Sequence, residues 1–320
     1  MANIEEIAKL ANVSVTTVSR VLNNHPYVKK EKREAILKAM EKCNYQKNIN
    51  AVHLKKGKTF QVGVVVPYTN HSYFGLLVDG IASEALEHDY NIVLIQTNYR
   101  EEVEIQALNM LRHKQIDALI ICSRECSMDI INDYVSYGPI VLCEDKKETN
   151  VSSIFIDQYK SFFKALEFLY ENGHTDIGYC IARRTGTNSN RRAKAYEDFM
   201  ASIGKPFRPD YIFEDCLYFE DGEKVVKRIK ELTAPPTALL VTSDQVAAGI
   251  ITCCNNEGII IPDQLAIVGF DNEPIAKVMN ITTIDIPLKS MGKKLFSHAV
   301  NEKGIVHEEI EVTLIKRQTV

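Results

Sequence analysis

From residue 60 to its end, the chain alternates short apolar runs with helical patterns, and this alternation limits the fold more than any other feature. The runs Val62–Val66, Ala118–Cys122 and Ile140–Cys143 are continuously apolar, as are strands buried on both faces of a parallel sheet. The segments between them, such as 73–89 and 101–114, carry apolar residues at helical spacing. Repeated strand–helix–strand units predict parallel sheets covered by helices.

A second series of the same kind begins near residue 153 and contains the apolar runs 177–181, 239–241 and 266–270. We therefore predict an α/β body of two doubly wound parallel-sheet lobes in tandem. Sheets of this type bind ligands outside the carboxyl ends of their strands. With two such lobes face to face, the cleft between them is the expected ligand site, and closure around a ligand is the expected motion.

The first 46 residues carry a different pattern, which predicts an all-α head. Apolar residues recur at helical spacing over 4–11, and the following Asn12 suits the left-handed conformation that ends a helix. Ser14 is a favoured N-cap for the next helix, over 15–22, and a third helix fits 30–43. Two short helices joined by a tight turn predict a helix-turn-helix.

The outer face of the second helix suits the major groove of DNA. Thr16, Thr17 and Arg20 lie on this face, and their hydroxyl, methyl and guanidinium groups can contact bases or phosphates. Residues 1–60 hold 12 lysines and arginines and five acidic residues, a net charge of +7, against −11 for the other 260 residues. A basic head on an acidic body favours nucleic acid as the partner of the head. The alternative is a three-helix protein-interaction module with a solvated basic face.

One continuous stretch of the head resembles a known family. Residues 4–23, with the sequence IEEIAKLANVSVTTVSRVLN, closely resemble the N-terminal signature of the lactose-repressor/galactose-repressor (LacI/GalR) family of bacterial transcription regulators. The resemblance implies a repressor that binds double-stranded operator DNA, a near-palindrome, as a homodimer. It also implies that Val15 and Thr16 read bases and that Arg20 contacts DNA. The DNA-binding residues expected in the head are Ser14, Val15, Thr16, Thr17, Arg20 and Asn23.

Residues 44–54 resemble the hinge of the same family. The resemblance implies that this segment becomes helical on the operator, that Asn48 and Ala51 contact DNA, and that Leu54 enters the minor groove. An apolar wedge of that kind kinks DNA, at a cost of about a few kcal/mol that the bent complex offsets. This chain has Lys47 where the family usually has proline. The alternative is a linker in which Leu54 packs on the body.

The body resembles the family's regulatory domain, which has the fold of periplasmic sugar-binding proteins, over nearly all of its length. Matching segments include Gly173-His174, Ser243-Asp244 and Gly269-Phe270-Asp271. The implied domains are a DNA-binding domain at 1–46, a hinge at 47–59, and an effector-binding and dimerisation domain at 60–320, with lobe 1 at approximately 60–157 and 287–303 and lobe 2 at approximately 158–286 and 304–320.

Side chains at the strand ends supply the candidate effector ligands. In the family, the positions matching Phe74, Arg192, Ser243 and Asp271 commonly touch the effector. A carboxylate accepts two vicinal hydroxyls, and a guanidinium donates a fork of hydrogen bonds. The alternatives are that Asp271 only caps the next helix, and that Arg192, expected to start a helix, pairs with an acid across the lobes. The expected effector-binding residues are His71, Tyr73, Phe74, Asp145, Arg192, Ser243 and Asp271.

Four arginines flank a polar loop in the second lobe, Arg183 and Arg184 on one side and Arg191 and Arg192 on the other. Such a cluster could hold a phosphorylated sugar, so the expected effector is a small sugar or a sugar phosphate. The equally acceptable alternative is a solvated surface loop with basic flanks.

No motif in the body indicates catalysis. Cys122 and Cys126 lack the spacing of zinc ligands, and the sequence has no nucleophile elbow, Walker loop or dinucleotide glycine fingerprint. We expect no enzymatic activity, no metal and no cofactor. The acidic N-terminus does not resemble a signal peptide, and no apolar run reaches the about 18–20 residues of a membrane span. We therefore expect a cytoplasmic regulator with reduced cysteines; an exported sugar-transport component and an enzyme on this fold are the alternatives.

Overall fold

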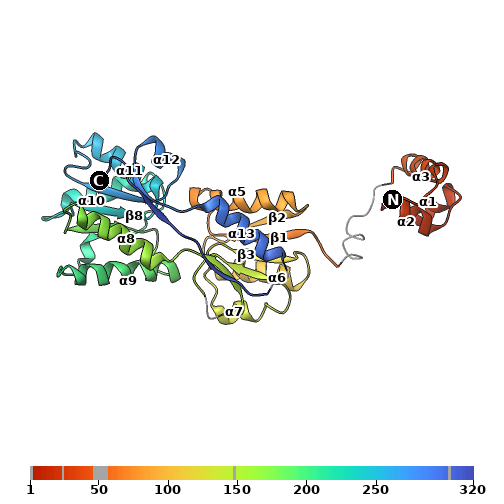
Figure 1. Ribbon diagram of the computed structural model, residues 1–320, viewed down its shortest axis with the longest axis horizontal. Coiled ribbons are helices and arrows are strands. Elements are labelled where there is room, and N and C mark those ends of the chain that lie inside the picture. The colour runs from red at the N-terminus through yellow and green to blue at the C-terminus, as the bar shows by residue number, and fades with distance from the viewer. Residues whose placement is uncertain (1–2, 24, 46–56, 147–148, 302–303) are drawn as a thin grey trace. The chain divides into compact units, whose positions relative to one another are not determined.

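The computed structural model describes residues 3–23, 25–45, 57–146, 149–301 and 304–320. Contacts within the chain define two compact units, a head of residues 1–59 and a body of residues 60–320. Figure 1 traces both units from the N-terminus in red to the C-terminus in blue. The predicted hinge contacts Asn48, Ala51 and Leu54 lie outside the described residues.

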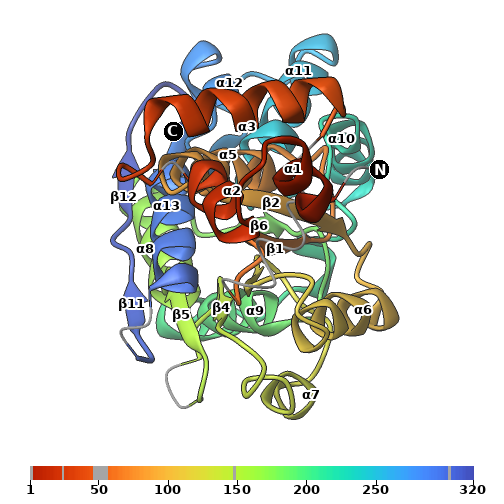
Figure 2. The same cartoon turned by 90° about the vertical axis from the view of Figure 1, so that its right-hand side faces the viewer.

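The head is built from three helices around a small apolar core. They are α1 (Ile4–Leu10), α2 (Val15–Leu22) and α3 (Lys30–Lys42), shown in red in Figure 2. Ile7, Val18 and Ile36 are fully buried where the helices meet. The predicted helix-turn-helix is confirmed, with a third helix completing its core.

Local hydrogen bonds fix the turn between α1 and α2. Asn12 has a φ of +50°, the left-handed conformation that asparagine tolerates better than most residues. The next amide, of Val13, donates to the carbonyl of Ala8 at 3.0 Å. Ser14 then caps α2, since its Oγ accepts from the amide of Thr17 at 3.2 Å. The residues that fix this turn, Asn12 and Ser14, can therefore be recognised in the sequence alone.

Lobe 1 of the body is a six-stranded parallel sheet with the order β11-β5-β4-β3-β1-β2. Apolar residues of alternate pleats pack on α5 and α13 on one face and on α6 and α7 on the other. The strands are β1 (Gln61–Val66), β2 (Asn91–Gln96), β3 (Ala118–Ile121), β4 (Ile140–Leu142), β5 (Ser152–Phe155) and β11 (His307–Glu309), and the helices are α5 (Ser72–Glu87), α6 (Glu101–Arg112), α7 (Met128–Asn132) and α13 (Leu288–Val300).

Lobe 2 repeats this plan with the strand order β12-β10-β9-β8-β6-β7, in which β12 alone is paired antiparallel. Helices α8 and α9 cover one face, and α10, α11 and α12 cover the other. The strands are β6 (Ile177–Cys180), β7 (Ile212–Phe213), β8 (Ala238–Val241), β9 (Ala266–Asp271), β10 (Thr282–Asp285) and β12 (Thr313–Ile315), and the helices are α8 (Gln158–Glu171), α9 (Thr187–Ser202), α10 (Asp221–Glu231), α11 (Asp244–Asn256) and α12 (Pro274–Val278), with a short 3-10 helix at Pro209–Tyr211.

The described chain passes between the lobes after β5, after β10 and after β11 (Figure 1). The first two passages agree with the predicted lobe bounds. The third does not, because residues 304–320 were all expected in lobe 2. His307–Glu309 instead forms β11, which pairs parallel with β5 in the sheet of lobe 1, and the chain enters lobe 2 only after it. This strand is short and largely polar, so its sequence gives no sign of the sheet that it joins.

Two glycines let α5 and α13 pack with their backbones in contact. A Cβ atom at Gly80 would lie 2.2 Å from the carbonyl oxygen of Lys289, and one at Gly292 would lie 2.3 Å from that of Leu77. Both distances are far below van der Waals contact, so neither position accepts a side chain without moving a helix. The two helices are side by side in Figure 1.

Three features of the part of the chain that the structure describes bear on membrane spans, metal ligands and disulfides. None of its helices is both long enough and apolar enough to cross a membrane. None of its groups of His, Cys, Asp and Glu side chains is arranged to hold a metal ion. The eight cysteines carry free thiols, and all but Cys43 and Cys253 are buried.

Candidate functional site

The exposed face of α2 presents three of the residues expected to bind DNA. Val15 is 42% exposed, and Thr16 and Arg20 are exposed as well. Ser14 and Thr17 instead stabilise the N-terminus of the helix. Ser14 Oγ accepts from the amide of Thr17, and the two hydroxyl oxygens are hydrogen-bonded at 2.9 Å. Val15, Thr16 and Arg20 are therefore the side chains of α2 that are free to reach a groove.

Hydrogen bonds within the head also fix the C-terminal end of α2 and the loop that follows it. Asn23 is the exposed C-cap, and its amide donates to the carbonyls of Ser19 and Val21. Arg33 of α3 donates from Nη2 to the carbonyl of His25 at 2.9 Å. This arginine therefore fixes the loop that follows α2.

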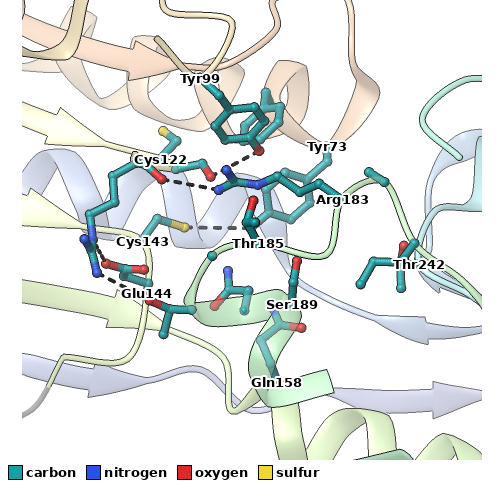
Figure 3. A pocket seen from close by; sticks show the side chains of 18 of the residues that line it. Tyr73, Tyr99, Cys122, Cys143, Glu144, Gln158, Arg183, Thr185, Ser189 and Thr242 are labelled. Carbon is teal, nitrogen blue, oxygen red and sulfur yellow. Dashed lines mark hydrogen bonds and ion pairs between the residues drawn. The ribbon is translucent and has the colours of Figure 1, made fainter. Parts of the chain in front are cut away.

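The body contains a cavity of about 260 Å³ at the carboxyl ends of strands from both sheets (Figure 3). Six of the seven residues predicted to bind the effector line it, namely His71, Tyr73, Phe74, Arg192, Ser243 and Asp271. The lining residues that sequence reasoning missed include Tyr99, Ser123, Arg124, Glu125, Cys143, Glu144, Gln158, Thr187, Ser189 and Thr242. The expected cleft between the lobes thus exists, with side chains of both lobes around it.

Asp271 ends β9 in a strained conformation. Its φ is +94° and that of the following Asn272 is +49°, values that non-glycine residues rarely adopt. Its side chain is 4% exposed. Burial raises the pKa of Asp271 well above its ordinary value, the nearby Glu273 and Asp244 raise it further, and Arg192 opposes the rise. Strain of this kind concentrates at functional sites, which supports Asp271 as a ligand-binding group.

His71 and Ser243 bring buried polar atoms to the cavity without a partner. His71 Nδ1 and Ser243 Oγ have no hydrogen-bond partner among the described residues, although the two side chains are only 8% and 3% exposed. Ser243 occupies the N-cap position of α11 but its hydroxyl does not cap the helix. Burial lowers the pKa of His71 to about 4, so its imidazole is neutral at pH 7. Buried polar atoms are normally paired, and hydroxyl groups of a bound ligand would supply partners.

Arg192 lies inside α9 and not at its start, because α9 already begins at Thr187. Residues 187–191 are polar, so apolar periodicity does not reveal this first turn. Arg192 Nε donates to Gln158 Oε1 at 2.8 Å, and its guanidinium carbon lies 5.6 Å from the centre of the Phe270 ring. These contacts hold the guanidinium in lobe 2, near Asp271.

Aromatic rings of α5 form one wall of the cavity. The rings of Tyr73 and Phe74 meet edge to face, with centres 5.1 Å apart. The hydroxyl of Tyr73 lies 3.7 Å from Cys143 Sγ, and burial raises the pKa of Tyr73 well above its ordinary value. The wall is thus apolar and neutral, a surface on which a sugar ring can stack.

Asp145 is absent from the cavity lining within the described residues. Its carboxylate accepts a hydrogen bond from Arg191 Nη2 at 3.0 Å. The residues after β4 that do line the cavity are Cys143 and Glu144, and Glu144 forms a close ion pair with Arg124. The neighbouring Glu144, and not Asp145, lines the cavity. The sequence does not say which of two neighbouring acids faces inward.

The four arginines around the polar loop already have partners. Arg183 pairs with Glu125 of lobe 1 at 2.6 Å, and Arg184 pairs with Glu214. Arg191 pairs with Asp145 of lobe 1. A pairing of this kind with an acid across the lobes was the alternative for Arg192, whose side chain instead contacts Gln158. Acidic partners therefore neutralise three of the four arginines that suggested a phosphate, and Arg192 is hydrogen-bonded to the neutral amide oxygen of Gln158.

Three acidic side chains are buried close together, Asp271 in the cavity lining and Asp244 and Glu273 behind it. Asp244 Oδ2 accepts from the amide of Glu273 at 2.8 Å and Oδ1 accepts from Thr283 Oγ1 at 2.8 Å. Burial raises the pKa of Asp244 to about 8 and that of Glu273 to about 7. Neither carboxylate oxygen of Glu273, which is 1% exposed, has hydrogen-bond geometry to a described residue; the nearby Ser72 hydroxyl only moderates its pKa rise.

Glu273→Gln is expected to stabilise the body above pH 7. Because the pKa of Glu273 is raised in the folded state, the folded protein keeps a proton that the unfolded chain releases between about pH 4.5 and 7. Wild-type stability therefore falls with rising pH in that window. The neutral glutamine should add about 1–3 kcal/mol at pH 8 and little at pH 5. Urea unfolding at both pH values measures this, with the exposed Glu311→Gln as control; an equal change at both pH values would contradict it.

Comparison with known proteins places both units in one family. Residues 59–320 match periplasmic binding proteins and sugar binding domain of the LacI family, and residues 3–48 match bacterial regulatory proteins of the lacI family. The chain is 42% identical to the uncharacterized HTH-type transcriptional regulator YkvZ of Bacillus subtilis (strain 168), over 100% of both chains.

Solved structures share the fold. A LacI family transcriptional regulator from Lactobacillus casei with bound glucose is 25% identical, with a TM-score of 0.75 over 81% of this chain and 99% of that chain. The lac repressor dimer bound to operator and the anti-inducer ONPF has a TM-score of 0.84 at 21% identity, over 99% of this chain and 98% of that chain.

Proposed function

This chain belongs to the LacI family of bacterial regulatory proteins, and from that membership we infer that a small neutral sugar bound between its lobes controls its binding to operator DNA. The chain is a DNA-binding transcription regulator with a sugar-binding body. The observation that carries the proposal is the cavity between the lobes, where Asp271, His71 and Ser243 present polar groups suited to hydroxyls. The regulator from Lactobacillus casei with bound glucose supports this ligand class.

The charge of the cavity favours a neutral sugar over a sugar phosphate. Its charged lining residues are balanced, with three arginines and three acids: Arg124, Arg183, Arg192, Glu125, Glu144 and Asp271. A phosphate would add negative charge beside buried carboxylates, while the nearby guanidinium groups are committed to existing partners. Burying an uncompensated charge is costly. Hydroxyl groups need no such compensation.

On the DNA side, we propose that α2 enters the major groove. Val15, Thr16 and Arg20 would make the contacts, because they are the exposed side chains at its start and outer face. We further propose that in the hinge Asn48 and Ala51 contact DNA and Leu54 enters the minor groove.

A single helix-turn-helix makes few base contacts, so the functional unit is a homodimer that reads a near-palindrome. The lac repressor dimer bound to operator supports this assembly. Exposed apolar side chains on the body would suit a dimer surface: Leu86 of α5 is 77% exposed, Leu94 of the edge strand β2 is 43% exposed, and Val278 of α12 is 81% exposed. We propose that these surfaces meet in the dimer, and that the protein acts in the cytoplasm as a binding protein and not as an enzyme.

Selection of bound DNA from a random duplex library tests the proposal. We expect the purified chain to enrich a near-palindrome. A panel of mono- and disaccharides and their 6-phosphates would then be tested by calorimetry and by operator binding. A neutral sugar should bind more tightly than its phosphate and change operator affinity by about 5–150-fold. Tighter binding of the phosphates would refute the neutral-sugar assignment, and failure to enrich any site would refute the DNA assignment.

Arg20→Ala is expected to weaken operator binding by about 1–3 kcal/mol if Arg20 contacts a base, and to reduce the salt slope by about 1 if it contacts a phosphate. Sugar affinity should not change, because Arg20 belongs to the head. Fluorescence anisotropy of labelled operator at several salt concentrations distinguishes the two contacts. Lys227→Ala, which removes an exposed basic side chain from the body, is the matched control and should leave operator binding unchanged. Equal operator binding by wild type and Arg20→Ala would remove Arg20 from the interface.

A further inference from the structure

Arg183 belongs to lobe 2, in the loop between β6 and α9, but its guanidinium contacts lobe 1. Nη1 donates to Glu125 Oε2 at 2.6 Å, and Nη2 donates to the carbonyl of Arg124 at 3.3 Å. The guanidinium carbon also lies 3.5 Å from the centre of the Tyr99 ring. Figure 3 shows the side chain extending from its loop toward Tyr99. A charge-assisted hydrogen bond and a cation–π contact are both among the stronger polar interactions available to arginine.

The loop of Arg183 is shaped for this arrangement. Gly186 has a φ of +98°, and a Cβ atom there would lie 2.8 Å from Arg183 Nη2. Glycine therefore provides both the backbone conformation and the room for the guanidinium. The adjacent Arg184 takes another direction and pairs with Glu214 of its own lobe. Arg183 and Arg184 thus share charge and sequence position but differ in what they join.

Arg183 connects more of lobe 1 than other contacts across the cavity do. Arg191 reaches one side chain, Asp145, at 3.0 Å, and Tyr218 reaches one, Asn70, at 3.1 Å. Arg183 instead joins two loops of lobe 1, the one after β2 and the one after β3. Opening of the lobes at this point must therefore break contacts with two loops of lobe 1.

We propose that Arg183 is a clasp, a positioning residue that holds lobe 1 against lobe 2 over the cavity. The clasp needs no ligand for these contacts, since Glu125, Arg124 and Tyr99 all belong to the chain. Arg183 also lines the cavity, so a ligand lies beneath the clasp and enters or leaves when it opens. The clasp involves the two lobes alone and does not depend on the identity of the ligand or on DNA binding.

Reactivity of cysteine thiols that line the cavity can measure how often the two lobes open, and the measurement needs no ligand. Cys122, Cys143 and Cys216 line it and are only 3%, 4% and 2% exposed. In the full chain at pH 8, we expect Arg183→Ala to speed iodoacetamide labelling of these thiols by about tenfold, the effect of one lost charge-assisted hydrogen bond on an opening equilibrium. Mass spectrometry of the digested protein resolves each site. Arg184→Ala should label like wild type, and Arg183→Lys should fall between, since lysine keeps the charge but not the fork.

Cys254 separates opening from unfolding, because it is fully buried in lobe 2 and is not part of the cavity lining. Its labelling rate should be the same in Arg183→Ala and wild type. Glu125→Gln should also speed labelling of the cavity thiols, and adding it to Arg183→Ala should have little further effect, as for residues that act as a pair. Unchanged cavity labelling in Arg183→Ala, or equal acceleration in Arg184→Ala, would overturn the clasp. Equal acceleration at Cys254 would assign Arg183 a general role in stability instead.

Discussion

Asp271→Asn is expected to lower sugar affinity by about a hundredfold or more and to abolish the response of operator binding to sugar. An ionised carboxylate accepts two hydroxyl hydrogen bonds, each worth about 1.5–3 kcal/mol because the acceptor is charged. A bound sugar therefore favours the ionised form of Asp271, which burial alone disfavours. Asparagine keeps the shape but presents one neutral acceptor and an N–H donor. Calorimetry with the sugar that wild type binds most tightly measures the loss. Wild-type affinity in this variant would exclude Asp271 as the ligand for hydroxyls.

The same substitution separates binding from folding. Burial, Glu273 and Asp244 together raise the pKa of Asp271, which means that its ionised form destabilises the folded body. Asparagine is neutral and tolerates the positive φ at this position better than most residues. We therefore expect an unfolding midpoint at pH 8 no lower than that of wild type. Asp263→Asn, at an exposed position, is the control and should change neither sugar affinity nor stability.

Gly80→Ala is expected to destabilise the body by about 3 kcal/mol or more, near the upper end for a single substitution. The new Cβ atom would lie 2.2 Å from the carbonyl oxygen of Lys289. That atom is backbone, so α5 and α13 must separate and the core of lobe 1 must loosen. Thermal unfolding followed by circular dichroism would show the loss.

A matched glycine on the same helix should respond in the opposite direction. Gly75 is exposed, and a Cβ atom there meets nothing within 4 Å. Gly75→Ala should stabilise the body by about 0.5–1 kcal/mol, the difference in helix propensity. If both substitutions shifted stability equally, propensity and not the approach of the two helices would explain the effect at Gly80.

The sequence predicted the regular parts of the fold because their signals are local. Buried strands such as β1 and β8 are continuous apolar runs in the sequence. Asn12, which suits the left-handed conformation, and the N-cap Ser14 indicate the turn between α1 and α2. Edge strands give weaker signals. The polar β11 and the two-residue β7 pack little apolar surface, so only the finished sheet reveals them.

The candidate site divides in the same way. Residues directly after strands, such as Asp271 and Ser243, could be predicted because parallel sheets bring their strand ends together. Partners across the lobes could not, since Arg183 and Glu125 are 58 residues apart and meet only when both lobes are folded. The four arginines suggested a phosphate for that reason: a sequence displays charges but not what neutralises them.

The passage of the chain after β11 has a consequence for synthesis on the ribosome. Lobe 1 starts at Phe60, yet its sheet gains β11 only when His307–Glu309 has emerged, and α5 finds its partner α13 only after residue 300. Translation supplies about 5–20 residues per second, so the early strands of lobe 1 wait many seconds for the segments that complete them. The head, whose core comes entirely from the first 45 residues, needs no such delay. A nascent chain therefore carries a finished DNA-reading unit well before the sensor that governs it is complete.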